Sequence, residues 1–254
     1  MISPININST GMQRLNFQIP TIIPKDPSTT PEKTGKKHDF VPLGQAEQLV
    51  AELIDKEFNI KIKNTRDKRF NKTELIIIYQ QLKKLPKEDV ALIEEIVKND
   101  TLGMELEMME AKMNKNKEVF GAYDKENRRI YLFKDMDEST LRKTLTHEIG
   151  HAVHSHRVSL YDFLRFTLAM NWKIYRQEQS YIQGNLLYNI GTILKEVQFS
   201  SLDELVNHFD FNTIKKKSSK VGGYILKAPK EVEETYAYSN PFETFASYYE
   251  KKFA

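Results

Sequence analysis

Residues 139–154 read STLRKTLTHEIGHAVH and carry the most informative pattern of the chain. Within this stretch His147 and His151 are four residues apart. On a helix this spacing places them about 40° apart around the axis and about 6 Å apart along it. Two imidazoles on one helix face can reach the same metal ion, and Glu148 stands beside the first, where it can hold and deprotonate a metal-bound water. The spacing therefore predicts a metal site that activates water.

The same stretch predicts a helix with one buried side. Its apolar residues recur at intervals of four, as expected for such a helix: Leu141, Leu145, Ile149 and Val153. Asp137 and Ser139 are both candidates for the N-cap, because either side chain can accept a hydrogen bond from a backbone N–H of the first turn. The pattern places the histidine pair on a buried helix that follows a predicted strand.

Four of the six histidines of the chain fall within ten residues, at positions 147, 151, 154 and 156. This clustering favours a metal site over the alternative that the pair are ordinary histidines of an amphipathic helix. His154 lies on the same face as His147 but about 10 Å further along the axis, too far for it to share an ion with both motif histidines. We expect His154 to pack against its neighbours or to orient them.

A catalytic zinc site takes three protein ligands and a water, so a third ligand is required. The chain has no cysteine, which leaves histidine and the carboxylates. Glu243 is the best candidate, because it opens an apolar helix downstream of the histidine pair. Its position has a second explanation, since Asn240 as N-cap, Pro241 as first helical residue and a glutamate three residues after the cap also form a helix-start signature. The spacing alone leaves both roles open.

The composition is that of an ordinary globular protein, with 254 residues, 40% of them hydrophobic. The 38 Lys and Arg residues against 35 Asp and Glu give a net charge of +3, and no basic stripe is interleaved with aromatics, so nucleic-acid binding receives little support. No stretch approaches the roughly 18 apolar residues of a membrane helix. The sequence also shows no secretory signal peptide. We expect no membrane span, and secretion or delivery by a route without a visible signal peptide, with a cytoplasmic location as the alternative.

The chain is predicted to divide into a flexible leader over residues 1–40 and one domain over residues 41–254. Six of the nine prolines lie within the first 42 residues, mixed with Ser, Thr, Asn and Lys, and no hydrophobic period accompanies them. The domain is expected to be α+β, with a small mixed β-sheet followed by a mostly helical half that carries the histidine pair. The metal-binding half covers about residues 119–254.

Hydrophobic periodicity places the individual elements. Helices are predicted over residues 46–54, 73–84 and 87–99, strands over 58–62 and 104–108, and a hairpin from 119–123 and 129–133. Apolar residues at 163–175 and 186–194 predict two further helices, and residues 211–234 a polar loop. The first helix is expected to bury one face, made of Ala46, Leu49, Val50, Leu53 and Ile54.

Two motifs, HEIGHAV at residues 147–153 and YAYSNPFETFA at residues 236–246, together resemble the anthrax lethal factor-like metalloprotease domain family, which includes the secreted Pro-Pro endopeptidases. The pattern of that family is HExxH-A-[VI], then a tyrosine seven residues before a glutamate that leads into Phe-Phe-Ala. The resemblance covers about residues 119–254 and implies a zincin-like fold.

Carried onto this sequence, the resemblance implies that His147, His151 and Glu243 bind one Zn²⁺ and that Glu148 is the general base. Tyr236 would stabilise the oxyanion or assist the leaving amine, because a neutral phenol can donate a hydrogen bond to a developing negative charge. Its neighbour at position 238 is also a tyrosine and could take this role instead.

The resemblance also implies how a substrate binds and where this chain departs from its relatives. The family lays its substrate along an edge strand that precedes the metal helix, which would be residues 119–123 or 129–133. Members commonly have a second acid one turn after the third ligand, where this chain has Ser247. The hydrogen bonds that orient the ligands are therefore expected to differ.

Together these features predict a monomeric zinc-dependent endopeptidase that acts on an extended protein or peptide, as a secreted toxin or effector. One alternative is a cytoplasmic regulatory metallopeptidase that cleaves a repressor-type protein, since its HExxH and downstream glutamate are similar. The other is a catalytically silent zincin fold that only binds a partner. The seven-residue spacing between Tyr236 and Glu243 favours the zinc endopeptidase. Glu148 argues against a fold that only binds a partner, because binding alone does not need that carboxylate.

Overall fold

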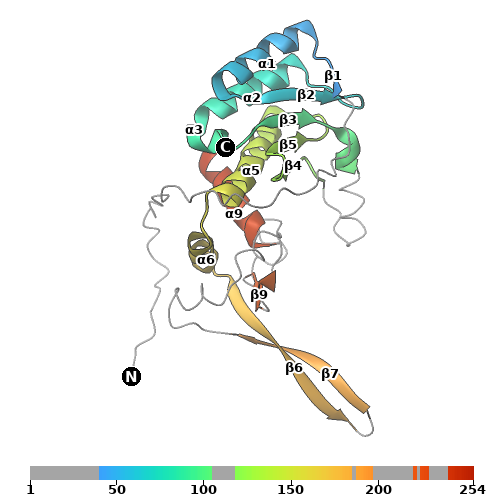
Figure 1. The fold of residues 1–254 in the computed structure, drawn as a ribbon, viewed down its shortest axis with the longest axis vertical. Coiled ribbons are helices and arrows are strands. Elements are labelled where there is room, and N and C mark those ends of the chain that lie inside the picture. The colour runs from blue at the N-terminus through green and yellow to red at the C-terminus, as the bar shows by residue number, and fades with distance from the viewer. Residues whose placement is uncertain (1–39, 105–117, 185–186, 197–219, 222–223, 229–239) are drawn as a thin grey trace, which may run out of the picture. The chain divides into compact units, whose positions relative to one another are not determined.

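The structure is a computed structural model and describes residues 40–104, 118–184, 187–196, 220–221, 224–228 and 240–254 (Figure 1). These residues form α-helices and two β-sheets, which confirms the predicted α+β class. The leader predicted for residues 1–40 lies outside the described residues, except for Phe40, which begins the first strand. None of the helices described is both long and apolar enough to cross a membrane.

A mixed five-stranded sheet organises the first half of the chain (Figure 1). In spatial order its strands are β1 (Phe40–Val41), β2 (Lys61–Thr65), β3 (Glu95–Lys98), β5 (Arg129–Leu132) and β4 (Gly121–Asp124). The three central strands run parallel, whereas β1 and β4 pair antiparallel at the two ends. Among the described residues β4 pairs with β5 alone, so β4 is an edge strand.

The hairpin of β4 and β5 confirms the prediction made for residues 119–133. Its register pairs Gly121 with Leu132 and Tyr123 with Ile130. Because side chains alternate along a strand, Tyr123 joins the main core, while its neighbour Ala122 packs against a second cluster around Val97, Tyr131 and Phe133. The same alternation directs Gly121 toward the side that holds the main core.

Three helices cover the main-core side of this sheet: α1 (Gln45–Phe58), α2 (Lys72–Lys84) and α5 (Glu138–His156). The helix predicted at residues 73–84 is confirmed as α2, and Asn71 and Glu74 close a reciprocal capping box at its start. Helix α5 contacts α2 as well as β4 and β5. The core between these elements includes Ile54, Leu75, Ile78, Ile96, Ile130, Leu145 and Ile149, all of which are fully buried.

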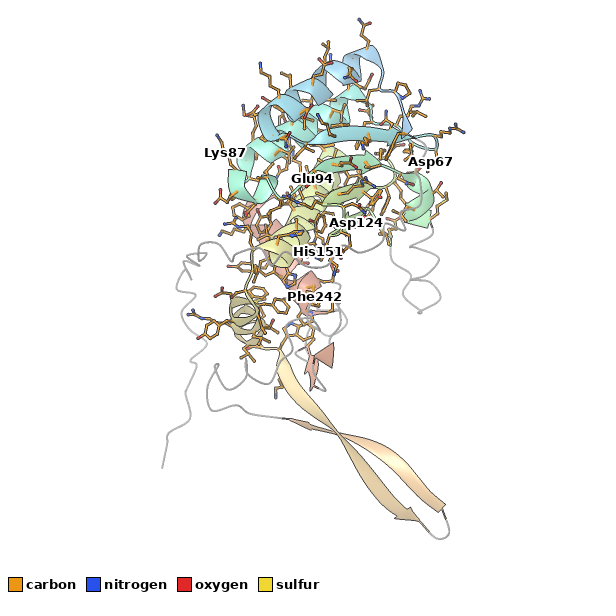
Figure 2. The ribbon with its side chains drawn as sticks, in the orientation of Figure 1. Asp67, Lys87, Glu94, Asp124, His151 and Phe242 are labelled. Atoms are coloured by element: carbon orange, nitrogen blue, oxygen red, sulfur yellow. The ribbon has the colours of Figure 1, made fainter. Side chains whose placement is uncertain are left out.

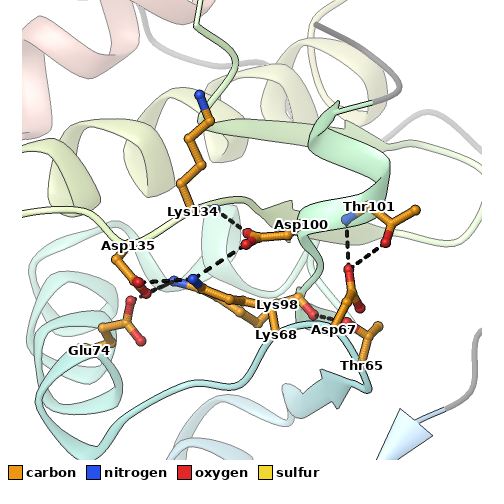
Figure 3. A network of polar contacts seen from close by, with 9 residues as sticks. All are labelled: Thr65, Asp67, Lys68, Glu74, Lys98, Asp100, Thr101, Lys134 and Asp135. Atoms are coloured by element: carbon orange, nitrogen blue, oxygen red, sulfur yellow. Dashed lines mark hydrogen bonds and ion pairs between the residues drawn. The ribbon is translucent and has the colours of Figure 1, made fainter. Parts of the chain in front are cut away.

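A polar network crosses the end of the sheet near Lys98 (Figure 3). Lys98 is fully buried at the end of β3, and its Nζ lies 2.5 Å from a carboxylate oxygen of Glu74. Lys68 lies 2.9 Å from Asp135 and 3.3 Å from Asp100. A buried charge is tolerated only with a partner, so these pairs hold α2, β3 and the segment after β5 together.

The helix predicted over residues 87–99 is wrong for most of its length. Only α3 (Lys87–Val90) is helical, and the chain then forms β3. Strand β3 lies between two parallel neighbours, with Ile96 in the main core and Val97 in the second cluster. A strand that is buried on both faces reads as a continuous apolar run, which periodicity cannot distinguish from a helix.

The strand predicted at residues 58–62 is displaced by three residues. Phe58 ends α1, Asn59 adopts a left-handed conformation with φ of 57°, and β2 begins at Lys61. Asparagine tolerates this conformation better than most residues, which is why the helix ends there. The burial predicted for α1 is also partly wrong, because Val50 and Ile54 are buried while Leu49 is 63% exposed. Ala46 and Leu53 are likewise exposed.

The strand predicted at residues 104–108 is wrong at its first residue, since residues 100–104 are helical. The rest of that segment lies outside the described residues. Residues 211–234, predicted as a polar loop, contain two short strands, β8 (Lys220–Val221) and β9 (Tyr224–Lys227). The other residues of that loop, apart from 228, lie outside the described part.

The second half of the chain was predicted to be mostly helical, and its described residues contain three helices but also a second β-sheet. Helix α6 (Leu160–Ala169) covers only part of the helix predicted over residues 163–175, and the segment predicted as a helix at 186–194 is a strand. Strands β6 (Lys173–Gly184) and β7 (Leu187–Glu196) form a long antiparallel hairpin, which β9 and β8 extend in the order β7-β6-β9-β8 (Figure 1). Asn171, with φ of 62°, follows α6, and the last pair of the hairpin ladder joins Gly184 to Leu187.

Candidate metal centre

The histidine pair lies on the buried middle of α5. Asp137 caps this helix, because its carboxylate accepts a hydrogen bond of 2.8 Å from the backbone N–H of Thr140, which settles the choice between the two predicted caps. Leu145 and Ile149 on this helix are fully buried in the main core, as predicted. The site is thus fixed to a helix that the core holds in place.

The last helix, α9 (Pro241–Phe253), crosses α5 at very short range. A β-carbon added at Gly150 would lie only 3.0 Å from Cα of Ala246 and 3.1 Å from Cβ of Tyr249. Gly150, inside the HExxH motif, and the small Ala246 therefore allow the two backbones to approach closely. This contact brings the start of α9 beside the two histidines.

Glu243 points its carboxylate at both histidines. Its Oε2 lies 3.0 Å from Nε2 of His147 and 3.4 Å from Nε2 of His151. One ligand atom from each of the three residues falls within 4.8 Å of the others, and all three residues are buried. The structure therefore brings together a His–His–Glu group that could hold a metal ion.

Asn240 caps the start of α9, and the Glu243 side chain is not used for this purpose. Asn240 is the N-cap, and its Oδ1 accepts hydrogen bonds from the backbone N–H groups of Phe242 and Glu243, each 3.0 Å long. Figure 2 labels His151 on α5 and Phe242 on α9, which mark the two sides of the site. Asn240 therefore caps the helix, while the carboxylate of Glu243 faces the two histidines.

The pKa values of His147 and Glu243 reflect a strong interaction between the two side chains. Burial alone would lower the pKa of His147, but hydrogen bonds to Glu243 and Glu250 outweigh burial and raise that pKa to about 10. Burial raises the pKa of the Glu243 carboxyl, yet His151 and His147 hold it well below its ordinary value. The His147 imidazole and the Glu243 carboxylate thus each favour the charged form, and a divalent cation bound by both would displace the proton of the imidazole.

Glu250 is a site residue for which the sequence analysis gave no role. Its Oε2 lies 3.3 Å from Nδ1 of His147, the ring nitrogen opposite the one that faces Glu243. A metal-bound histidine commonly donates its other ring N–H to a carboxylate, which fixes the orientation of the ring. Glu250 follows Glu243 by seven residues, two helical turns, and so lies on the same face of α9. That spacing was visible in the sequence.

The expected place for the orienting acid was position 247, one turn after Glu243, where the chain has a serine. The structure supplies the acid one turn later, at Glu250. The departure at Ser247 therefore does not deprive His147 of a carboxylate partner.

Glu148 is buried within the site, at 6% exposure, directly after the first histidine. Its carboxylate adds to the negative charge that raises the pKa of His147. Three of the four predicted residues thus form the group that could hold a metal ion, and the carboxylate of the fourth, Glu148, is buried close to them.

The remaining histidines of the cluster do not join the group. The ring of His154 packs against Phe163 at 4.5 Å and Phe242 at 4.7 Å between centroids, which confirms the predicted packing role. Nε2 of His156 lies 2.8 Å from the hydroxyl of Tyr123 on β4. His154 thus helps to hold α6 and α9 against the metal helix.

Two further predictions concerned the tyrosine for the oxyanion and the strand for the substrate. Tyr236 and Tyr238, the candidates for oxyanion stabilisation, lie outside the described residues, so that role stays a prediction. Of the two strands considered for substrate binding, β5 lies inside the sheet between β3 and β4, whereas β4 is the edge. Only residues 121–124 of β4 remain a candidate for strand addition.

The geometry defines a candidate three-ligand metal centre between two buried helices. No protein-family model, no curated protein and no solved structure matches the chain.

Proposed function

We propose that the protein is a zinc-dependent endopeptidase. The observation that carries this proposal is the buried His147–His151–Glu243 group with a second carboxylate, Glu148, beside it. Two imidazoles and one carboxylate are a ligand set of catalytic Zn²⁺, which keeps its fourth position for water. A purely structural zinc site has four protein ligands, and the described residues supply three.

The chain's own residues have distinct tasks in this reaction. Zn²⁺, when bound, would polarise the scissile carbonyl and acidify water to a pKa of about 7. Glu148 accepts a proton from the attacking water at its carboxylate and passes it to the departing amine. Glu250 keeps the His147 ring in the orientation that directs Nε2 toward the ion.

Substrate binding is proposed to occur at β4. This strand pairs with β5 on one side only among the described residues, so its other edge can accept an extended peptide by backbone hydrogen bonds. The same strand contacts α5, the helix that carries Glu148. The family resemblance of the HEIGHAV and YAYSNPFETFA motifs supports the zincin-like fold, the role of Tyr236 and a secreted effector function.

The decisive test combines metal analysis with digestion of a peptide library. We expect cleavage that a chelator blocks and added Zn²⁺ restores. Replacement of Glu148 by Gln should abolish cleavage and leave the bound zinc in place. Full activity of Glu148→Gln would refute the assigned base, and zinc binding without any cleavage would favour a domain that only binds a partner.

A further inference from the structure

Strand β4 approaches the metal helix most closely at Gly121. A β-carbon added there would lie 2.7 Å from Cγ2 of Thr144, 3.1 Å from Cγ of Glu148 and 3.2 Å from Oε1 of Glu148. Thr144 and Glu148 are one turn apart on α5, so both face the strand. A side chain at position 121 would therefore overlap with Thr144 and press against the Glu148 side chain.

The local backbone does not explain the glycine. Gly121 is part of a regular antiparallel ladder with Leu132, and its φ lies outside the left-handed region that favours glycine. Glycine is a poor strand former, and inside a strand it often marks a place where another group comes close. The close groups here are the side chains of Thr144 and Glu148.

We propose that Gly121 is a positioning residue for the general base. By carrying no side chain, it leaves room for the Glu148 carboxylate beside the edge strand, next to the position of a substrate paired with β4. This inference rests on the proposed function, since it concerns the base of that reaction. Glu148 is not a ligand in the His–His–Glu group, so metal binding does not depend on Gly121.

The test uses a Thr144→Ser background, which removes the methyl group that makes the shortest contact and leaves Glu148 in place. Thr144 lies outside the site, so this background should cleave peptides like the original chain. Adding Gly121→Ala should lower kcat by about 10-fold, because the Glu148 side chain must shift by a few tenths of an ångström and a displacement of about 1 Å can cost about 100-fold. We expect KM to change less than about threefold and the zinc content to stay the same.

Ala122→Ser is the matched control, because it also adds one atom to β4 but on the opposite face, toward the second cluster. We expect this variant to keep its kcat. Equal loss of kcat in both variants, or unchanged kcat in the Gly121→Ala variant, would overturn the inference.

A second readout does not depend on activity. The thermal midpoint of the metal-free protein is measured for Gly121→Ala with Glu148 present and with Glu148→Ala, both in the Thr144→Ser background. If Glu148 fills the space, the drop in midpoint caused by Gly121→Ala shrinks by more than half once Glu148 is truncated. An equal drop in both, including failure of both proteins to fold, overturns the inference. Absence of cleavage by the Thr144→Ser protein would instead refute the proposed function and leave this coupling measurable.

Discussion

Oε2 of Glu250 lies 3.3 Å from Nδ1 of His147, while Oε2 of Glu243 lies 3.0 Å from Nε2 of the same ring. One helix, α9, therefore contacts both nitrogens of a single imidazole through two acids that are two turns apart. Glu250 contacts the outer nitrogen of the ring, and Glu243 completes the His–His–Glu group that could hold a metal ion.

Replacement of Glu250 by Gln should weaken Zn²⁺ binding by about 10- to 100-fold, the usual effect of removing a carboxylate that orients a ligating histidine. Competition with a chromophoric chelator measures this change. Ser247→Ala is the control and should bind zinc like the original chain. The reverse result, with Ser247 important and Glu250 dispensable, would contradict the orientation assigned to Glu250.

Replacement of Glu243 by Ala should reduce zinc affinity by more than the about 100-fold expected for an orienting partner, because a ligand is lost. Asn240→Ala provides the comparison, since it removes the cap of the same helix at a cost of about 1 kcal/mol of stability. That variant should melt at a lower temperature and still bind one zinc ion when folded. Zinc content by mass spectrometry and thermal unfolding separate the two effects. Zinc retained by Glu243→Ala would remove it from the ligand group.

Asp89 is expected to be the most sensitive residue of the contact between α3, α5 and α9. It is 2% exposed, its Oδ2 accepts a hydrogen bond of 2.7 Å from the Tyr249 hydroxyl, and its other oxygen pairs with Arg157. Asp89→Ala leaves the arginine without its buried partner and should destabilise the fold by about 3–5 kcal/mol. Tyr249→Phe removes one hydrogen bond to a charged group and should cost about 1.5–3 kcal/mol. Urea unfolding measures both values, and a larger effect of Tyr249→Phe would contradict this order.

Asp67 makes stability depend on pH at the acidic end. Burial raises its pKa, but hydrogen bonds from Thr65 and Thr101 outweigh burial and lower the pKa to about 2. Figure 3 shows the two bonds that the backbone N–H and the hydroxyl of Thr101 donate to Asp67. A carboxyl whose pKa is lower in the folded state stabilises the fold above its unfolded pKa of about 3.9, and this contribution is lost as pH falls toward 2. Asp67→Asn should therefore lower the thermal midpoint at pH 6 and have a smaller effect near pH 2. An effect that is constant over this range would contradict the assignment.

The sequence predicted those parts of the site that depend on short spacings. His147, Glu148 and His151 follow from one helical turn, whereas the spacing left Glu243 open between a capping role and ligation, and the family resemblance favoured ligation. Glu250 was missed because its partner lies on another helix, and only the crossing at Gly150 and Ala246 shows that the two meet.

The errors in the fold have a common physical cause. Strand β3 and the β6–β7 hairpin contain apolar residues without a clear period of two, so local periodicity predicted helices in both. What makes them strands is pairing with residues distant in sequence, such as Ile96 with Ile130. Elements with strong local signals, such as the capped α2 and the β4–β5 hairpin, were predicted correctly.

The β6–β7 hairpin separates the two halves of the metal centre along the chain, and among the described strands it pairs only with itself and β9. At its base the indole N–H of Trp172 donates to the Thr244 hydroxyl at 3.2 Å, next to Glu243. The β6–β7 hairpin can therefore vary in length, in evolution or in protein engineering, while the hydrogen bond between Trp172 and Thr244 at its base is kept. Deleting two paired residues from each of β6 and β7 would leave every remaining side chain on its original face of the hairpin, because side chains alternate with a period of two.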